Sequence, residues 1–299
     1  MQAPAALTYI PAADPAGIEV RDRQARWVAS FTTGACTVRL TGPRRSFTEA
    51  TALRVEHGIW VRTLPEPFAG TVDEDWLAHA LEANATGIPD ILDLAMQYID
   101  RAPPLFDKRL KIAGDASYGP PVGDTRGEGS DFYDYLGVQW TDPDGKAHMP
   151  RHDQYGCLDC SGFMRMTWGY RHSLPAAGVR DQIPLCWTPK TCALPRRAVQ
   201  MCNEGPGVDV IQNTGKRPRD LTPIKVGDLV FFDADPADGS DIDHVGMYLG
   251  RDEKRYRRFI SSRKSADGPT LGDFRQRSIL DGDRETDLYT RSFRAARRL

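Results

Sequence analysis

The sequence has no long hydrophobic run and no excess of positive charge. Its 299 residues contain no uninterrupted apolar window of about 18 residues, the length that suggests a membrane-spanning helix. Lysine and arginine number 39 against 41 aspartates and glutamates, a formal net charge of -2. Without a basic field the chain is poorly suited to holding a polyanion. We therefore expect no transmembrane segment and no nucleic-acid partner.

The start of the chain lacks the features of a secretion signal. The segment MQAPAALTYIPAADPAG has neither a basic beginning nor a continuous apolar stretch. A secreted protein whose signal peptide has been removed would begin in this way, and so would a cytoplasmic protein with a loose terminus.

Cysteine is scarce for a chain of this length. Too few are present for a disulfide scaffold, which leaves the redox compartment open; the six lie at positions 36, 157, 160, 186, 192 and 202. A hydrophobic fraction of 40% is enough for one large core or two smaller ones. We expect a folded globular protein.

The first 115 residues read as strands followed by helices. Residues 18–64 contain runs rich in β-branched and aromatic residues, separated by Gly, Pro and Thr. Apolar residues then recur at helical spacing over 72–83 and 88–99, and RAPP ends the second helix. Because a loop-rich stretch follows at 115–130, we predict an N-terminal extension over 1–115, β-rich and then helical, of unknown role.

The second half reads as a helix followed by an antiparallel sheet. A helix is expected to start near Cys160, and an irregular stretch rich in Pro and Cys follows it. Three apolar runs of strand length come later: VGDLVFF, HVGMYLG and RRFISS. We predict an α+β fold, with a second domain over 116–299 that contains an insertion near 172–192.

The stretch QYGCLDCSGFMRMTW carries two cysteines, of which only Cys160 is followed by Ser-Gly and a helical pattern. A cysteine that opens a helix gains from free backbone N–H groups and from the helix dipole, both of which favour the thiolate. A redox pair would normally use the first cysteine, Cys157, and a zinc site would need two more ligands at matching spacing. We predict Cys160 as a nucleophile and expect no metal and no cofactor.

A thiolate nucleophile needs a general base on a rigid element. His244 begins the apolar strand HVGMYLG, whereas the other five histidines lie on predicted loops or helix faces. His244 is therefore the candidate base.

Several motifs in order resemble the NlpC family of papain-like cysteine peptidases of bacterial cell walls. They are DCSGF at 159–163, LPRRAVQ at 194–200, the block ending in KVGDLVFF at 221–232, DHVGMYLG at 243–250 and the segment 259–273. The resemblance covers roughly the second half, and it implies a cysteine-bearing helix packed on an antiparallel sheet.

The resemblance also implies hydrolysis of an amide bond in peptidoglycan stem peptides, typically the bond from the side chain of D-glutamate to a diamino acid. Cys160 would attack the carbonyl, and His244 would move the proton. Asp159 and Ser161 would help to hold the free amine of the substrate. A secreted or wall-bound monomer that acts on peptidoglycan peptides is expected.

Two positions depart from the family pattern. The residue that orients the histidine ring is Ser261, which adds no charge, so Ser262 or a nearby acid is an alternative. Upstream, the pattern Gly-x-x-Tyr appears as GVQW, which puts Trp140 near the substrate without a hydroxyl; Tyr155 is an alternative source of one.

The insertion leaves a further choice. Cys186 and Cys192 either form a disulfide there, with Cys202 as another partner, or all three are small buried hydrophobic residues. In a secreted protein we expect one disulfide. The departures at Ser261 and Trp140 also leave open a non-catalytic wall-binding protein on the same fold. A third option is a related amidase or acyltransferase that uses the same Cys-His pair on another amide.

Overall fold

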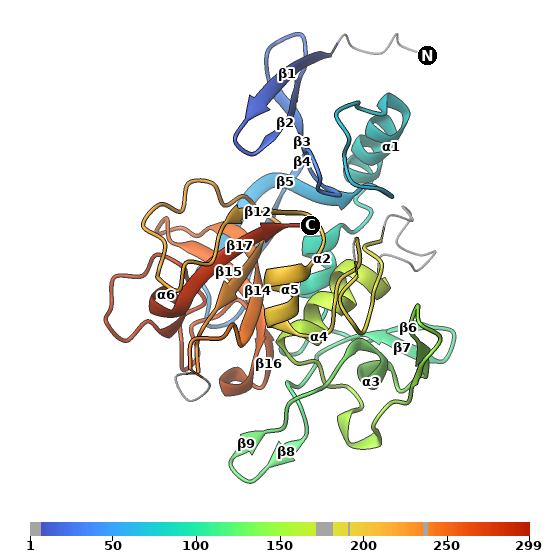
Figure 1. Cartoon of the computed structure of the whole chain (residues 1–299), viewed down its shortest axis with the longest axis vertical. Helices are drawn as coiled ribbons and strands as arrows, with labels where there is room; N and C mark the ends of the chain where they lie inside the picture. Colours follow the sequence, from blue (N-terminus) through green and yellow to red (C-terminus); the bar gives the residue numbers. More distant parts are fainter. Residues whose placement is uncertain (1–6, 172–181, 191, 236–238) are drawn as a thin grey trace.

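The computed structural model describes residues 7–171, 182–190, 192–235 and 239–299 (Figure 1). The chain mixes helices with antiparallel sheets, which confirms the predicted class. Its N-terminal part is a five-stranded sheet in the order β1-β2-β3-β4-β5. The strands are β1 (Thr8–Ala13), β2 (Ala16–Arg21), β3 (Trp27–Thr32), β4 (Thr37–Phe47) and β5 (Val55–Thr63).

The strand β4 runs through a segment that the sequence suggested was a break. TGPRR contains Gly and Pro, yet β4 keeps its pairing with β5 across this segment because the register shifts at a bulge between Thr41 and Arg45. Gly42 lies under the indole of Trp60, where an added Cβ would come within 2.4 Å of the ring. Gly42 and Pro43, which in the sequence indicate a turn, therefore lie in a β-bulge here.

Two helices follow the first sheet, as the apolar spacing predicts. Helix α1 (Glu74–Ala85) begins at Asp73, whose side chain accepts a hydrogen bond from the Trp76 N–H. Helix α2 (Ile91–Met96) begins at Asp90 with a capping box formed with Asp93. Both helices start later than expected, because each begins at an aspartate cap.

The second large sheet has six antiparallel strands in the order β12-β17-β13-β14-β15-β16. Three of them, β13 (Leu229–Phe232), β14 (His244–Arg251) and β15 (Arg257–Arg263), match the predicted apolar runs. The other three were not predicted: β12 (Val208–Ile211), β16 (Gly268–Thr270) and β17 (Phe293–Arg298).

Helix α4 (Cys160–Arg165) packs on β14 and β15 and continues as a π-helical turn over Met166–Tyr170. Its start confirms the helix predicted near Cys160. The remaining helices are α3 (Phe132–Leu136), α5 (Ala198–Glu204) and α6 (Leu288–Ser292). Short strands complete the fold: β6 (Leu105–Asp107), β7 (Leu110–Ala113), β8 (Pro121–Val122), β9 (Thr125–Arg126), β10 (Trp140–Thr141) and β11 (Ala147–His148).

Two hydrophobic clusters form the core. The smaller lies between the N-terminal sheet and α1 and includes Val38, Leu40 and Leu77. The larger contains most of the buried apolar side chains of the second half, together with side chains of β5, of α2 and of the residues that follow α2. No helix among the described residues is both long enough and apolar enough to cross a membrane.

The expected disulfide is absent, since none of the six cysteines forms a disulfide in the structure. Cys186 and Cys202 are buried, Cys202 within the larger hydrophobic cluster, and Cys192 is exposed with a backbone φ of 66°. For the two buried cysteines this agrees with the alternative of small buried hydrophobic residues. Most of the predicted insertion, residues 172–181 and 191, lies outside the described residues.

Candidate active site

The sulfur of Cys160 lies at the start of α4, against the first residues of β14. Asp159 caps the helix by accepting the Gly162 N–H at 2.7 Å. The Cys160 Sγ is 3.8 Å from the Asp243 carbonyl oxygen and also receives the Val245 N–H. Because Asp243 and Val245 flank His244, the predicted nucleophile and base lie on elements that touch.

Glycine at position 162 makes this packing possible. A Cβ at Gly162 would come within 2.2 Å of the Ser130 carbonyl oxygen, so no larger residue fits without moving the backbone. The segment before the helix is held as well, because the Asp159 N–H donates to the Ser130 carbonyl at 2.9 Å. The close approach of Ser130 thus fixes the first turn of α4.

His244 is the first residue of β14, and its ring is held on two sides. Its Nε2 lies 3.0 Å from the Ser261 Oγ on the neighbouring strand β15. The rings of Tyr289 and Phe232 lie 5.1 Å and 5.8 Å from the imidazole. The structure therefore brings Ser261 to His244 and adds Tyr289 of α6, which the sequence pattern did not indicate.

Burial keeps both candidate catalytic groups neutral. Only 5% of Cys160 and 8% of His244 is exposed. Desolvation raises the pKa of the Cys160 thiol to about 12, with the Asp159 charge adding to the effect. Desolvation, followed by the Arg263 cation, lowers the pKa of His244 to about 3. The position of Cys160 at a helix start, taken alone, predicts a thiolate. Here the loss of solvation raises the thiol pKa more than the backbone N–H groups lower it.

Asp159 and Ser161 already have a cationic partner. The guanidinium of Arg196 lies 2.7 Å from the Asp159 carboxylate and donates to the Ser161 Oγ at 2.6 Å. Arg196 comes from the segment LPRRAVQ, so two of the sequence motifs meet in one ion pair. A substrate amine near Asp159 would share that carboxylate with Arg196.

Trp140 lies in an aromatic stack on β10. Its ring neighbours are Phe132, Tyr133 and His148, at 5.4 Å, 6.1 Å and 5.1 Å, and the Arg165 guanidinium lies 5.0 Å from its ring. These contacts make it part of the packing beside α4 and give no support to a substrate role. The alternative source of a hydroxyl, Tyr155, is 55% exposed.

A different tyrosine is close to the sulfur. Burial raises the pKa of the Tyr118 hydroxyl, and the Asp159 carboxylate and the ionised form of Cys160 raise it further, which places all three groups in one site. The chain reaches this position because Leu158 N–H donates to the Ser117 carbonyl at 2.8 Å. The Tyr-Gly pair in SYGPP was the available sequence signal for this tyrosine. Tyr118 lies farther upstream of Cys160 than Trp140, the position at which the family spacing placed the tyrosine.

The arrangement contains the parts of a thiol-based acyl transfer: a thiol, an imidazole, backbone N–H groups at a helix start and a buried tyrosine hydroxyl. Among the residues that the structure describes, no group of three or more His, Cys, Asp or Glu side chains could hold a metal ion. The site is therefore best described by its protein groups.

Comparison with known proteins agrees with this geometry. No curated protein matches the chain. The model of the NlpC/P60 family, whose members are generally cell-wall peptidases, matches residues 145–264 and so includes Cys160, His244 and Ser261. The resemblance predicted for the second half of the chain is thus confirmed by the match of residues 145–264 to the NlpC/P60 family model.

Proposed function

We propose that this protein is a papain-like cysteine peptidase that hydrolyses the amide bond from the side chain of D-glutamate to a diamino acid in peptidoglycan stem peptides. The observation that carries the proposal is the position of the Cys160 sulfur beside the backbone of Asp243 and Val245, the two chain neighbours of His244, whose ring is held by Ser261. Because the proposed substrate is a component of the cell wall, we also propose that the protein acts outside the cytoplasm. We propose further that it acts as a monomer.

In the proposed mechanism the His244 Nε2–H donates to the Ser261 Oγ, which leaves Nδ1 unprotonated and able to accept a proton. Nδ1 takes the thiol proton as the sulfur attacks the carbonyl carbon. The imidazolium then protonates the leaving amine, and water hydrolyses the thioester to release the acid and restore the thiol.

Hydrogen-bond donors must be in place to stabilise the negative charge that develops on the substrate carbonyl oxygen. Backbone N–H groups at the start of α4 and the Tyr118 hydroxyl are the nearest candidates, and one such donor is worth about 3 kcal/mol in comparable sites. The resting pair is neutral because the thiol pKa is raised and the imidazole pKa is lowered. Proton transfer therefore accompanies attack instead of preceding it.

One observation favours a second candidate, a non-catalytic wall-binding protein on the same fold. A thiol whose pKa is raised to about 12 by burial reacts slowly, since the thiolate is the nucleophile. In that case the site would bind stem peptides and leave them intact.

Digestion of defined muropeptides separates these functions. Wild type should release the free diamino-acid peptide, and Cys160→Ala should release none. Cys157→Ser is the matched control, because Cys157 lies three residues earlier in the same CxxC and its thiol donates to the Tyr155 carbonyl. It should keep full activity.

Mass spectrometry of the products identifies the bond. Cleavage between D-glutamate and the diamino acid supports the peptidase, whereas cleavage or acyl transfer at another amide indicates the related amidase or acyltransferase. Equal release by Cys160→Ala would refute both, and binding without release by wild type would support the second candidate.

A further inference from the structure

The end of β17 brings a cation to the N-terminal sheet, and Figure 1 shows this end of the chain beside β5. The guanidinium of Arg298 forms a two-pronged ion pair with Asp228, at 2.8 Å and 2.9 Å. It also donates to the Thr32 Oγ1 of β3 at 2.9 Å. Asp228 belongs to the turn before β13, so this turn is fixed beside the sheet. The same turn carries a second cation, Lys225.

A third cation faces this turn from the N-terminal sheet. Glu19, Ser30 and Arg39 are directly paired across β2, β3 and β4, and directly paired residues point to the same face of a sheet. On β5, Arg39 is opposite Val61. A Cβ at Gly227 would come within 2.8 Å of the Val61 side chain. The turn before β13 therefore packs on the face of the sheet that carries Arg39.

The three cations act on one another. Burial, followed by the Arg298 cation, lowers the pKa of Arg39 to about 10, so Arg39 stays charged at neutral pH. Burial, followed by the cations of Arg39 and Arg298, lowers the pKa of Lys225 as well. Both Arg39 and Lys225 are half-buried. Like charges that are partly withdrawn from water destabilise the fold unless negative charge balances them.

The acids nearby do not balance these charges. Asp228 is held by the β17 guanidinium and also accepts the Lys225 backbone N–H at 2.8 Å. Glu19 pairs with Arg21 at 3.0 Å. Within the ranges that the structure describes, the side chains of Arg39 and Lys225 form no ion pair and no hydrogen bond. Two cations are therefore left with unused donors.

A hydroxyl next to Arg39 also has a donor to spare. The Ser30 Oγ accepts the Trp27 Nε1–H at 2.8 Å, and Ser30 is buried. A hydroxyl can donate as well as accept, and in the described part of the chain the Ser30 hydroxyl proton has no acceptor. Cationic and hydroxyl donors without an acceptor are the groups that bind an anion.

We propose that Arg39, Lys225 and Ser30 bind one small oxyanion of phosphate size, either the free ion or the phosphate group of a small phosphomonoester. The planar guanidinium of Arg39 donates to two oxygens of the anion, and the Lys225 ammonium and the Ser30 hydroxyl donate to the others. The carboxylate of Glu19 on the same face disfavours a long polyanion.

This site is separate from the candidate active site, so the inference does not rest on the proposed function. The backbone of Asp228 pairs with Tyr248, four residues along β14 from His244, a span of about 13 Å. The anion bridges the N-terminal sheet and the turn before β13. Its binding should therefore hold these two parts of the chain together and stabilise the folded protein.

The first experiment compares melting temperatures in sodium chloride and in sodium phosphate at equal ionic strength, so that screening is the same. Phosphate should raise the melting temperature of wild type, whereas Arg39→Gln should show only the general effect of an excluded salt. Arg39→Lys should keep part of the specific rise, because it retains the charge without the planar fork. In chloride, Arg39→Gln should melt at the temperature of wild type or above it, because it removes a like charge and breaks no ion pair.

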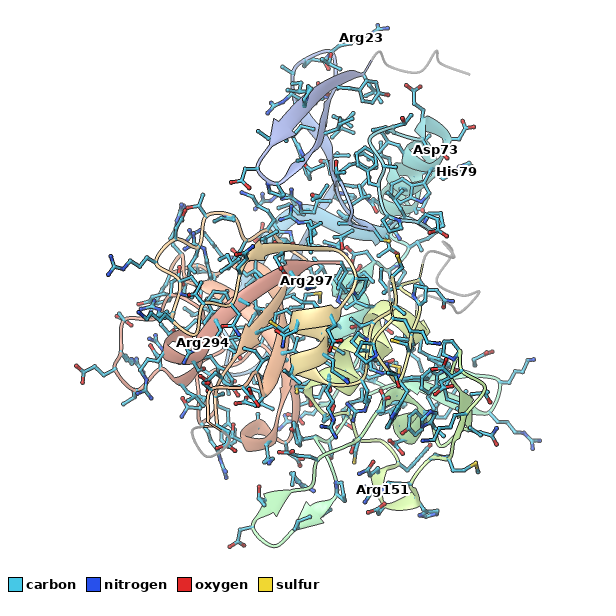
Figure 2. The ribbon with its side chains drawn as sticks, in the orientation of Figure 1. Arg23, Asp73, His79, Arg151, Arg294 and Arg297 are labelled. Atoms are coloured by element: carbon cyan, nitrogen blue, oxygen red, sulfur yellow. The ribbon has the colours of Figure 1, made fainter. Side chains whose placement is uncertain are left out.

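Arg23→Ala is the matched control. Arg23 is an exposed arginine at the far end of the N-terminal sheet, as Figure 2 shows. Its loss should leave the response to phosphate as large as in wild type.

Titration calorimetry of the full chain with inorganic phosphate and with glycerol phosphate identifies the source of the anion. One anion should bind per chain, and Arg39→Gln or Lys225→Gln should raise Kd about 10-fold, the effect of one charge-assisted hydrogen bond. Similar affinity for both compounds supports a phosphomonoester, and binding of inorganic phosphate alone supports the free ion.

Two results would overturn the inference. One is an equal response to phosphate in wild type, Arg39→Gln and Lys225→Gln. The other is a melting temperature of Arg39→Gln that is lower than that of wild type by the same amount in chloride and in phosphate, which would assign Arg39 to the packing of the fold.

Discussion

At the residue scale, the properties of the site follow from burial. His244 is enclosed by Phe232, Tyr289 and the Ser261 hydroxyl, so its charged form is poorly solvated. The Arg263 cation opposes protonation as well. A histidine in this position remains an unprotonated base in mildly acidic solution, where an ordinary histidine would be charged.

This predicts that stability falls as the pH falls. The pKa of His244 is lowered to about 3 in the folded chain, against an ordinary value of 6.5, so between these values the unfolded state binds the extra proton. Its contribution is fully present above pH 6.5 and is lost at about 1.4 kcal/mol per pH unit below it. Denaturant titrations from pH 7.5 to 4.5 measure the slope.

Two variants check the assignment. His244→Gln should lower the slope of the free energy of unfolding against pH by the contribution of one proton, about 1.4 kcal/mol per pH unit. His79→Gln should leave it unchanged, because His79 is exposed on α1, as Figure 2 shows. An unchanged slope in His244→Gln would show that this imidazole is protonated as easily in the folded chain as in the unfolded one.

At the element scale, α4 is held by a contact that tolerates only glycine. Gly162→Ala would place a methyl group 2.2 Å from the Ser130 carbonyl, so either the helix or the Ser130–Asp131 segment must move. We expect a loss of about 1–3 kcal/mol in the free energy of unfolding, typical of overpacking, although alanine is the better helix former. Urea denaturation measures this loss, and an unchanged or higher midpoint would contradict it.

The strands that could be predicted from the sequence differ physically from β17, which could not. β13, β14 and β15 are apolar runs, so their pattern was visible. β17 has the sequence FRAARR, and its last two arginines are buried because distant residues satisfy them. Arg298 pairs with Asp228 at 2.8 Å, and Arg297 donates to the Cys202 carbonyl at 2.9 Å. Such pairing leaves no local signal, because the pattern by itself indicates an exposed segment.

The same distinction applies to the site. Cys160 and His244 stand in local motifs and could be identified, whereas Tyr118 and Tyr289 reach the site from segments far away in the sequence. Trp140 was chosen by spacing to a motif, but the short hairpin β10–β11 turns it into the stack beside α4. Spacing is a weak guide where loops of unknown path intervene.

At the scale of the whole molecule, contacts cross the loop-rich stretch after position 115. His57 Nε2 lies 2.8 Å from the Leu249 carbonyl oxygen of β14, and the Arg298 guanidinium donates to the Thr32 Oγ1 at 2.9 Å. Glu49 accepts a hydrogen bond from the Leu271 N–H at 2.9 Å. The larger core also takes side chains from both sides of this stretch. The first 115 residues thus cover one side of the sheet that carries His244.

We therefore predict that residues 116–299 do not fold alone. The larger core would lose ten buried residues, among them Phe47, Val55, Val61, Ile91 and Leu92. The burial of these five side chains alone is worth up to roughly 7–15 kcal/mol, which is comparable to the total stability of a domain. The full chain should melt in one cooperative transition by circular dichroism, whereas the fragment should show no transition and should bind a hydrophobic dye. A fragment with a cooperative transition at the same temperature would show that the first 115 residues are a separate module, and the contacts through His57 and Arg298 would then contribute little to the stability of the catalytic half.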